Sequence, residues 1–166
     1  MLGEHLVPTE YASRINRFYG AATEVLIRRD ALIDKLIGDE VMALFIPGIC
    51  GPDYRRKAAE SAMALLGAVG YGKASEPWMP IGVAVNSGIT YVGNVGPEGV
   101  VDFTALGDTV NTASRLAASA AAGEVLVNED VYASLAEKIS GTERRILNLR
   151  GKEAPFPVHV LRALAS

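Results

Sequence analysis

Apolar side chains in the first thirty residues recur at steps of three and four positions. The set comprises Ile15, Phe18, Tyr19, Ala22, Val25 and Leu26. This spacing predicts a helix over residues 9–29 with one buried face. Thr9, which follows Pro8, is the expected N-cap of that helix.

Two short runs of strand-forming residues follow the helix. They are ALIDKLI (residues 31–37) and EVMALFI (residues 40–46), and they meet at Gly38 and Asp39. The pattern predicts a hairpin whose tight turn requires Gly38. Lys35 then lies on the first strand, and Asp39 lies at the turn.

The same patterns continue to the end of the chain. A second amphipathic helix is predicted over residues 52–70, ended by Gly70, and a third over residues 109–122, capped by Asp108 and stopped by Gly123. Residues 81–88 and 89–96 are expected to pair as strands, with further strands at 100–107, 124–128, 144–149 and 156–161 and a short helix over 129–136.

The order helix, strand, strand, helix, strand predicts an α+β domain. It lacks only an opening strand to make the β-α-β-β-α-β ferredoxin-like unit. We therefore interpret residues 1–166 as a single domain of this kind with strand and helix additions at its C-terminal end. The absent strand would be central in the sheet, so two unpaired strand edges beside a buried core are expected. Such a chain should aggregate, exchange strands with another copy or pair with an edge strand of a neighbouring molecule.

Composition limits the classes of protein to which the chain can belong. The chain has 166 residues, 49% hydrophobic and 21% charged, with a formal net charge of −3, so a soluble globular domain is expected without a general attraction for nucleic acid. The single cysteine, Cys50, cannot form an internal disulfide, which favours a cytoplasmic location. The longest apolar run, SAMALLGAVG, falls well short of the roughly 20 residues that cross a bilayer, so no membrane contact is expected.

Two stretches carry polar groups that suggest chemistry, DKLIGDEVMALF (residues 34–45) and DFTALGDTVNTASRL (residues 102–116). Asn111 and Arg115 are four residues apart and so share one face of the third predicted helix, near its N-terminal end. Taken alone, Asp39 is as readily a turn-capping residue as a metal ligand. An isolated Arg115 on an Ala-rich helix would be a surface residue.

Together, and in this order, the two stretches resemble the catalytic domain of class III nucleotide cyclases, the adenylyl and guanylyl cyclase family. The resemblance covers nearly the whole chain. It implies conversion of a nucleoside triphosphate to a 3′,5′-cyclic monophosphate and pyrophosphate at sites shared across a head-to-tail homodimer. Two Mg²⁺ or Mn²⁺ ions per complete site and a role in intracellular signalling are implied as well.

The resemblance also assigns roles to residues. It implies that Asp39 binds metal, that Lys35 and Thr104 recognise the base, that Asn111 orients the ribose and that Arg115 stabilises the transition state. Many relatives carry Asp at the position of Thr104. A threonine at this position resembles the bicarbonate-responsive branch of the family. The resemblance implies that Asp39 of one subunit meets the Lys, Thr, Asn and Arg of the other, so that Lys35 and Asp39 of one chain serve opposite sites.

Donor and acceptor chemistry favours ATP as the substrate. Adenine offers an N1 acceptor and an N6 donor, which suit the Lys35 ammonium and the Thr104 oxygen. Guanine would place its N1 donor opposite the Lys35 ammonium, which is also a donor. A buried polar group that is left without a hydrogen-bond partner costs about 1–3 kcal/mol. A hydroxyl can donate or accept, so we expect Thr104 to discriminate less sharply than Asp would.

The chain departs from the family in one respect. The family opens with a strand carrying Phe-x-Asp-Ile, whose Asp completes the metal pair, and here that Asp would fall before Met1. Neither Glu4 nor Asp34 is a convincing substitute. Glu4 is too close in sequence to Asp39, and Asp34 should face the opposite side of its strand from Lys35. The chain by itself is therefore expected to be inactive, and a non-catalytic nucleotide-sensing or dimerisation module of the same fold is the alternative interpretation.

Overall fold

The computed structural model describes residues 7–97, 99, 101–135 and 142–163; Glu4 lies outside them. The first half contains α1 (Pro8–Ile27), β1 (Leu32–Ile37), β2 (Glu40–Leu44), α2 (Pro47–Cys50) and α3 (Tyr54–Val69). The second half contains β3 (Val83–Val85), β4 (Tyr91–Val95), β5 (Asp102–Leu106), α4 (Asp108–Ser119), β6 (Glu124–Val127), α5 (Glu129–Ala133), β7 (Glu143–Leu147) and β8 (Phe156–Arg162). None of the described helices is long and apolar enough to cross a membrane.

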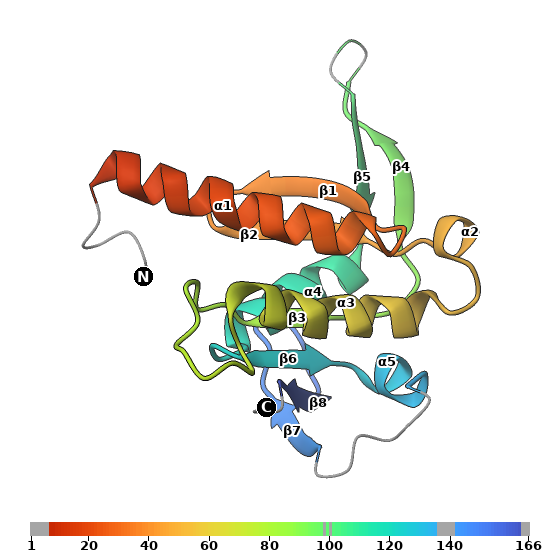
Figure 1. The fold of residues 1–166 in the computed structure, drawn as a ribbon. Helices are drawn as coiled ribbons and strands as arrows, with labels where there is room; N and C mark the ends of the chain where they lie inside the picture. The colour runs from red at the N-terminus through yellow and green to blue at the C-terminus, as the bar shows by residue number, and fades with distance from the viewer. Residues whose placement is uncertain (1–6, 98, 100, 136–141, 164–166) are drawn as a thin grey trace.

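The predicted α+β arrangement is confirmed. The order α1, β1, β2, α3, β3 follows the predicted helix, strand, strand, helix, strand. Helix α1 lies against the β1–β2 hairpin and packs on α3, while the strands β3, β6, β8 and β7 form a four-stranded sheet (Figure 1). The β4–β5 hairpin projects away from this body (Figure 1).

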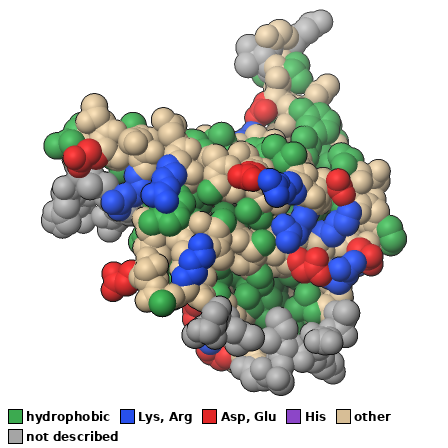
Figure 2. Space-filling model, in the orientation of Figure 1, with side chains coloured by type: hydrophobic (Ala, Val, Ile, Leu, Met, Phe, Trp, Pro, Cys, Tyr) green, Lys and Arg blue, Asp and Glu red, His purple; other side chains and the backbone are tan. Residues whose placement is uncertain are grey.

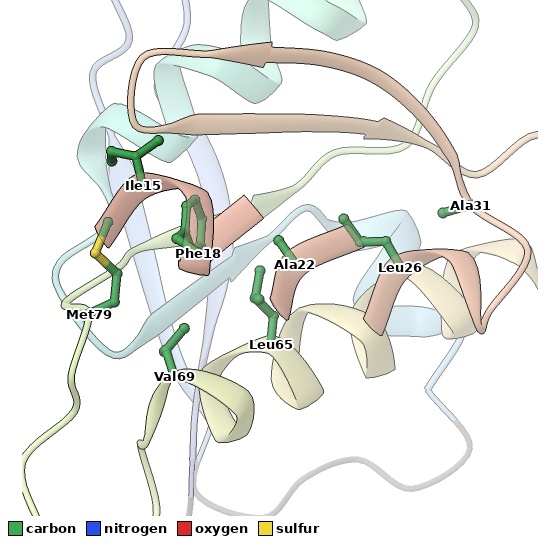
Figure 3. Packing of buried hydrophobic residues seen from close by; sticks show 8 residues of the cluster. All are labelled: Ile15, Phe18, Ala22, Leu26, Ala31, Leu65, Val69 and Met79. Carbon is green, nitrogen blue, oxygen red and sulfur yellow. The ribbon is translucent and has the colours of Figure 1, made fainter. Parts of the chain in front are cut away.

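The buried face of α1 is the one that its spacing predicts. Ile15, Phe18, Ala22 and Leu26 are buried and belong to one hydrophobic cluster (Figure 3). They form one cluster with Ala31, with Leu65 and Val69 of α3, and with Met79 (Figure 3). Removing this apolar surface from water is what holds α1 and α3 together.

The helix ends differ in detail from the expectation. Helix α1 begins at Pro8, whose fixed φ suits the first turn, so Val7 rather than Thr9 is the N-cap. Helix α4 begins at Asp108 with Gly107 as its N-cap, and the Asp108 carboxylate makes an ion pair with Lys152 and caps no backbone N–H. This helix ends at Ser119, four residues before Gly123.

The predicted pairing of residues 81–88 with 89–96 is wrong. Strand β3 pairs in parallel with β6, and β4 pairs antiparallel with β5. The intervening segment holds the start of α4: Asn86 Nδ2 donates to the Thr109 carbonyl at 2.9 Å, and Thr109 Oγ1 donates to the Ile89 carbonyl at 2.7 Å. These contacts direct the chain away from β3, so no hairpin closes there.

Among the unpaired strand edges of the described residues, those of β2 and β3 border one cavity, where a further strand is expected from the sequence. Among the described residues β2 pairs only with β1, and β3 pairs only with β6. A cavity of about 830 Å³ lies beside both edges, and its lining includes residues 39–47 and 79–90. The backbone groups of these edges remain available for pairing with another extended segment.

A buried carboxylate holds the far side of the four-stranded sheet together. Glu124 of β6 accepts a bidentate pair of hydrogen bonds from Arg145 of β7, both at 2.9 Å, and a further one from Arg162 of β8 at 2.6 Å. The hydrogen bonds from Arg145 are the main cause that lowers the pKa of Glu124 from 4.5 to about 2. The network fixes the register of three strands.

We expect Glu124→Gln to lower the free energy of unfolding by about 1–3 kcal/mol at pH 7, because it removes the buried charge that both guanidinium groups share and leaves them only the more exposed Glu143. The pKa of Glu124 is lower in the folded state than in the unfolded state. Its charged form therefore stabilises the fold at pH values above the unfolded pKa, and this stabilisation is lost as the pH falls toward the folded pKa. The difference between wild type and variant should therefore be smaller at pH 3 than at pH 7 in urea unfolding. Glu24→Gln, which removes an exposed pair with Arg28, is the control and should change stability by less than about 0.5 kcal/mol.

Candidate functional site

The β1–β2 hairpin presents Asp39 at its tip. The two strands close at the Ile37–Glu40 pair, and Gly38 has φ +59°, as the first central residue of a type II′ turn requires. Tyr19 of α1 donates a hydrogen bond to the Gly38 carbonyl at 2.7 Å, which fixes the turn to the helix. The turn predicted from the sequence is confirmed, and Asp39 is exposed on it.

The same hairpin contains a β-bulge at Asp34. Ile33 pairs with Ala43 and Lys35 pairs with Met42, so Asp34 is an extra residue with no partner across the hairpin. Its side chain is fully buried. Simple alternation predicts that Asp34 and Lys35 face opposite sides of the strand, but the bulge lets both reach strand β5, so that expectation is wrong.

Lys35 lies beside two carboxylates. Its ammonium makes an ion pair with Asp102 of β5 and lies 3.8 Å from Asp34 Oδ2. The hydrogen bond with Asp102 is the main cause that raises the pKa of Lys35 above its usual value, opposed in part by desolvation. Lys35 is therefore charged and offers only donors to a ligand.

Thr104 completes this cluster from strand β5. It is buried, and its hydroxyl donates a hydrogen bond to Asp34 Oδ2 at 3.0 Å. Lys35 and Thr104 are thus brought together, although nearly seventy residues separate them in the chain. We call Lys35, Thr104, Asp34 and Asp102 the β1–β5 cluster.

Asn111 and Arg115 lie on helix α4, one turn apart. Asn111 is exposed, and Arg115 is half-buried. The Arg115 guanidinium rests against Gly151, where a Cβ atom would lie 3.4 Å from its Nη2 atom. No hydrogen bond or ion pair within the described ranges joins either side chain to Lys35, Thr104 or Asp39.

A divalent metal ion such as Mg²⁺ or Mn²⁺ needs several hard oxygen ligands in one place. Among the described residues no group of three or more His, Cys, Asp or Glu side chains is placed to hold a metal ion. Asp39 is a suitable hard oxygen ligand, but one carboxylate does not make a site for Mg²⁺ or Mn²⁺. The described residues alone therefore do not fit a complete metal centre.

Sequence reasoning did not identify two members of the β1–β5 cluster as parts of the site, Asp34 and Asp102. Each stands next to a candidate residue or two positions from one, in IDKL and VDFT. An acidic residue close to each base-recognition candidate is a feature of the sequence that indicates membership of the site. The bulge that turns Asp34 toward Thr104 leaves no such mark in the sequence.

Comparisons with known proteins identify the family of the chain. Residues 2–162 match the family model described as adenylate and guanylate cyclase catalytic domain. An adenylate cyclase of Anabaena cylindrica is 27% identical over 173 residues, covering 98% of this chain and 34% of that protein. The chain thus spans about a third of this relative's length.

Solved structures show the same fold. The crystal structure of the guanylyl cyclase Cya2 superposes with a TM-score of 0.85 at 20% identity, covering 98% of this chain and 85% of that one. The adenylyl cyclase CyaB from P. aeruginosa gives a TM-score of 0.76 at 24% identity, covering 98% and 87%. The family match over nearly the whole chain, on this fold, shows that the protein belongs to the adenylate and guanylate cyclase catalytic domain family.

Proposed function

We propose that this chain is the catalytic domain of an adenylyl cyclase, which converts ATP to 3′,5′-cyclic AMP and pyrophosphate. The observation that carries the proposal is the meeting of Lys35 and Thr104 in the β1–β5 cluster. A charged donor beside a hydroxyl oxygen is complementary to the N1 acceptor and the N6 donor of adenine. The family match supplies the class of reaction.

In the proposed reaction the ribose 3′ oxygen attacks the α-phosphorus of the same nucleotide. A bond forms between these two atoms, the bond from the α-phosphorus to the bridging oxygen breaks, and the hydroxyl proton passes to solvent as pyrophosphate leaves. Arg115 stabilises the negative charge that gathers on the α-phosphate oxygens, and Asn111 orients the ribose. Their spacing on α4 allows both to reach one bound nucleotide.

We also propose that the site is shared between two copies of the chain, arranged head to tail. Lys35 and Thr104 form one group of residues, and no hydrogen bond or ion pair within the described chain joins them to Asp39, which is proposed to serve the opposite site. Large hydrophobic side chains are exposed near the first group, including Leu36, Ile37, Tyr91, Phe103 and Leu106. Figure 2 shows hydrophobic side chains along the projecting β4–β5 hairpin, a surface that a second copy would cover.

Asp39 is proposed as one ligand of the Mg²⁺ or Mn²⁺ ions that cyclase domains use in general. Its exposed position at a hairpin tip is open to a bound triphosphate and to a partner subunit. Turnover by the full-length protein distinguishes this proposal from a domain that binds nucleotide or dimerises without turnover.

The base preference tests the proposal. We expect the full-length protein to use ATP with a kcat/KM about ten- to a hundredfold above that for GTP, because guanine leaves a donor opposed to Lys35. Lys35→Ala should remove most of this preference, while Lys73→Ala, which changes an exposed loop lysine, should leave it unchanged. Equal use of both nucleotides by the wild type would contradict the assignment to ATP.

A further inference from the structure

Asp34 is a fully buried carboxylate that the proposed reaction does not use. Its side chain has no exposed surface, although burying a charge is costly unless the charge is paired. Oδ2 accepts the hydrogen bond from Thr104 at 3.0 Å and lies 3.8 Å from the Lys35 ammonium. Oδ1 has no hydrogen-bond partner among the described residues.

The need of Lys35 for a counter-ion does not explain Asp34. Lys35 already pairs with Asp102, at a much shorter distance than it keeps from Asp34. The direct hydrogen bond of Asp34 goes to Thr104. The β-bulge that produces this contact interrupts the hairpin ladder at this residue alone.

This hydrogen bond fixes the polarity of Thr104. A carboxylate only accepts hydrogen bonds, so the single hydroxyl hydrogen of Thr104 must point at Asp34. What remains on the Thr104 oxygen is acceptor capacity. A free threonine hydroxyl could turn its hydrogen toward a ligand, but in this cluster it cannot do so without breaking the bond to a buried carboxylate.

We propose that Asp34 is a positioning residue that makes Thr104 an acceptor and thereby sets the preference of the site for adenine over guanine. The inference rests on the proposed function and deepens it. At the position of the adenine N6 amino group, a donor, guanine carries O6, an acceptor. O6 would face lone pairs of Thr104, so the threonine discriminates more sharply than an unrestrained hydroxyl would.

The test compares the ratio of kcat/KM for ATP to kcat/KM for GTP in the full-length protein and in two variants. Asp34→Leu keeps a similar volume and removes the acceptor, so Thr104 is free to donate to O6, and the ratio should fall about tenfold. Asp34→Asn can present its oxygen or its amino group to Thr104, and the ratio should fall about threefold. Asp53→Leu, which removes an exposed carboxylate paired with Arg56, should leave the ratio unchanged.

A double variant separates polarity from general damage to the site. Thr104→Val removes the hydroxyl, and adding Asp34→Leu to it should change the ratio no further, because no hydroxyl remains to be oriented. A second fall of similar size would overturn the inference. So would an unchanged ratio in Asp34→Leu or, if that variant does not fold, in Asp34→Asn.

Failure of this inference and failure of the proposed function give different results. The ratio of dissociation constants for ATP and GTP, measured by calorimetry on the same samples, reports base preference without turnover. A wild type that prefers ATP, with variants that keep its ratio, overturns only the role of Asp34. A wild type that binds neither nucleotide, or binds both equally, overturns the role of Asp34 and the assignment to ATP together.

Discussion

Replacing Arg115 with Ala is expected to lower the kcat for cyclic AMP formation by two to three orders of magnitude, with little change in folding. A single preorganised donor that faces developing charge contributes about this much to catalysis. The side chain is half-buried on α4, rests against Gly151, and makes no ion pair with a described residue. Its loss therefore removes charge from the site without disturbing the core.

The measurement is steady-state turnover of ATP by the full-length protein, with thermal unfolding of the same samples. Arg150→Ala is the matched control, because Arg150 is an exposed arginine in the loop that also contains Gly151. The control should retain its turnover and melting temperature. Near-normal activity in the folded Arg115→Ala variant would remove Arg115 from the proposed mechanism.

Mixing two inactive variants is expected to restore activity. Asp39→Asn and Arg115→Ala should each be nearly inactive as homodimers, since each damages both shared sites. In a mixed dimer both substitutions fall in one site and the other site is intact, if Asp39 and Arg115 of one copy serve opposite sites. Random exchange of equal amounts should give about a quarter of wild-type activity, because half of the dimers are mixed and each has one working site of two.

Subunit exchange must be shown independently, for example by energy transfer between labelled copies. A mixture of Asp39→Asn with Lys73→Ala serves as the reference for dilution of active subunits by inactive ones. No recovery in a mixture of Asp39→Asn and Arg115→Ala that demonstrably exchanges would mean that each copy carries a self-contained site. Recovery would show that the residues named here are divided between two chains.

The hydrophobic pattern predicts most of the fold. The spacing from Ile15 to Leu26 identifies the buried face of α1, and Gly38 identifies the hairpin turn. These features are local, since a helical face and a two-residue turn depend on neighbours in the sequence. Motif order was sufficient to recognise the family that the comparisons then showed.

Long-range pairing could not be predicted in the same way. Strand β3 pairs with β6, more than forty residues farther along the chain, because Asn86 and Thr109 hold the intervening segment against α4. Nothing in the alternation of residues 81–96 distinguishes this arrangement from a hairpin. The candidate site shows the same limit, because Asp34 joins it only through a bulge.

The most direct test of the proposed activity is cyclic AMP formation from ATP and Mn²⁺ by the full-length protein, with the product identified by mass spectrometry. We expect cyclic AMP and pyrophosphate in equal amounts, and loss of both in the Arg115→Ala variant. A folded dimer that binds ATP but forms no cyclic AMP would contradict the adenylyl cyclase assignment and favour a nucleotide-binding or dimerisation domain.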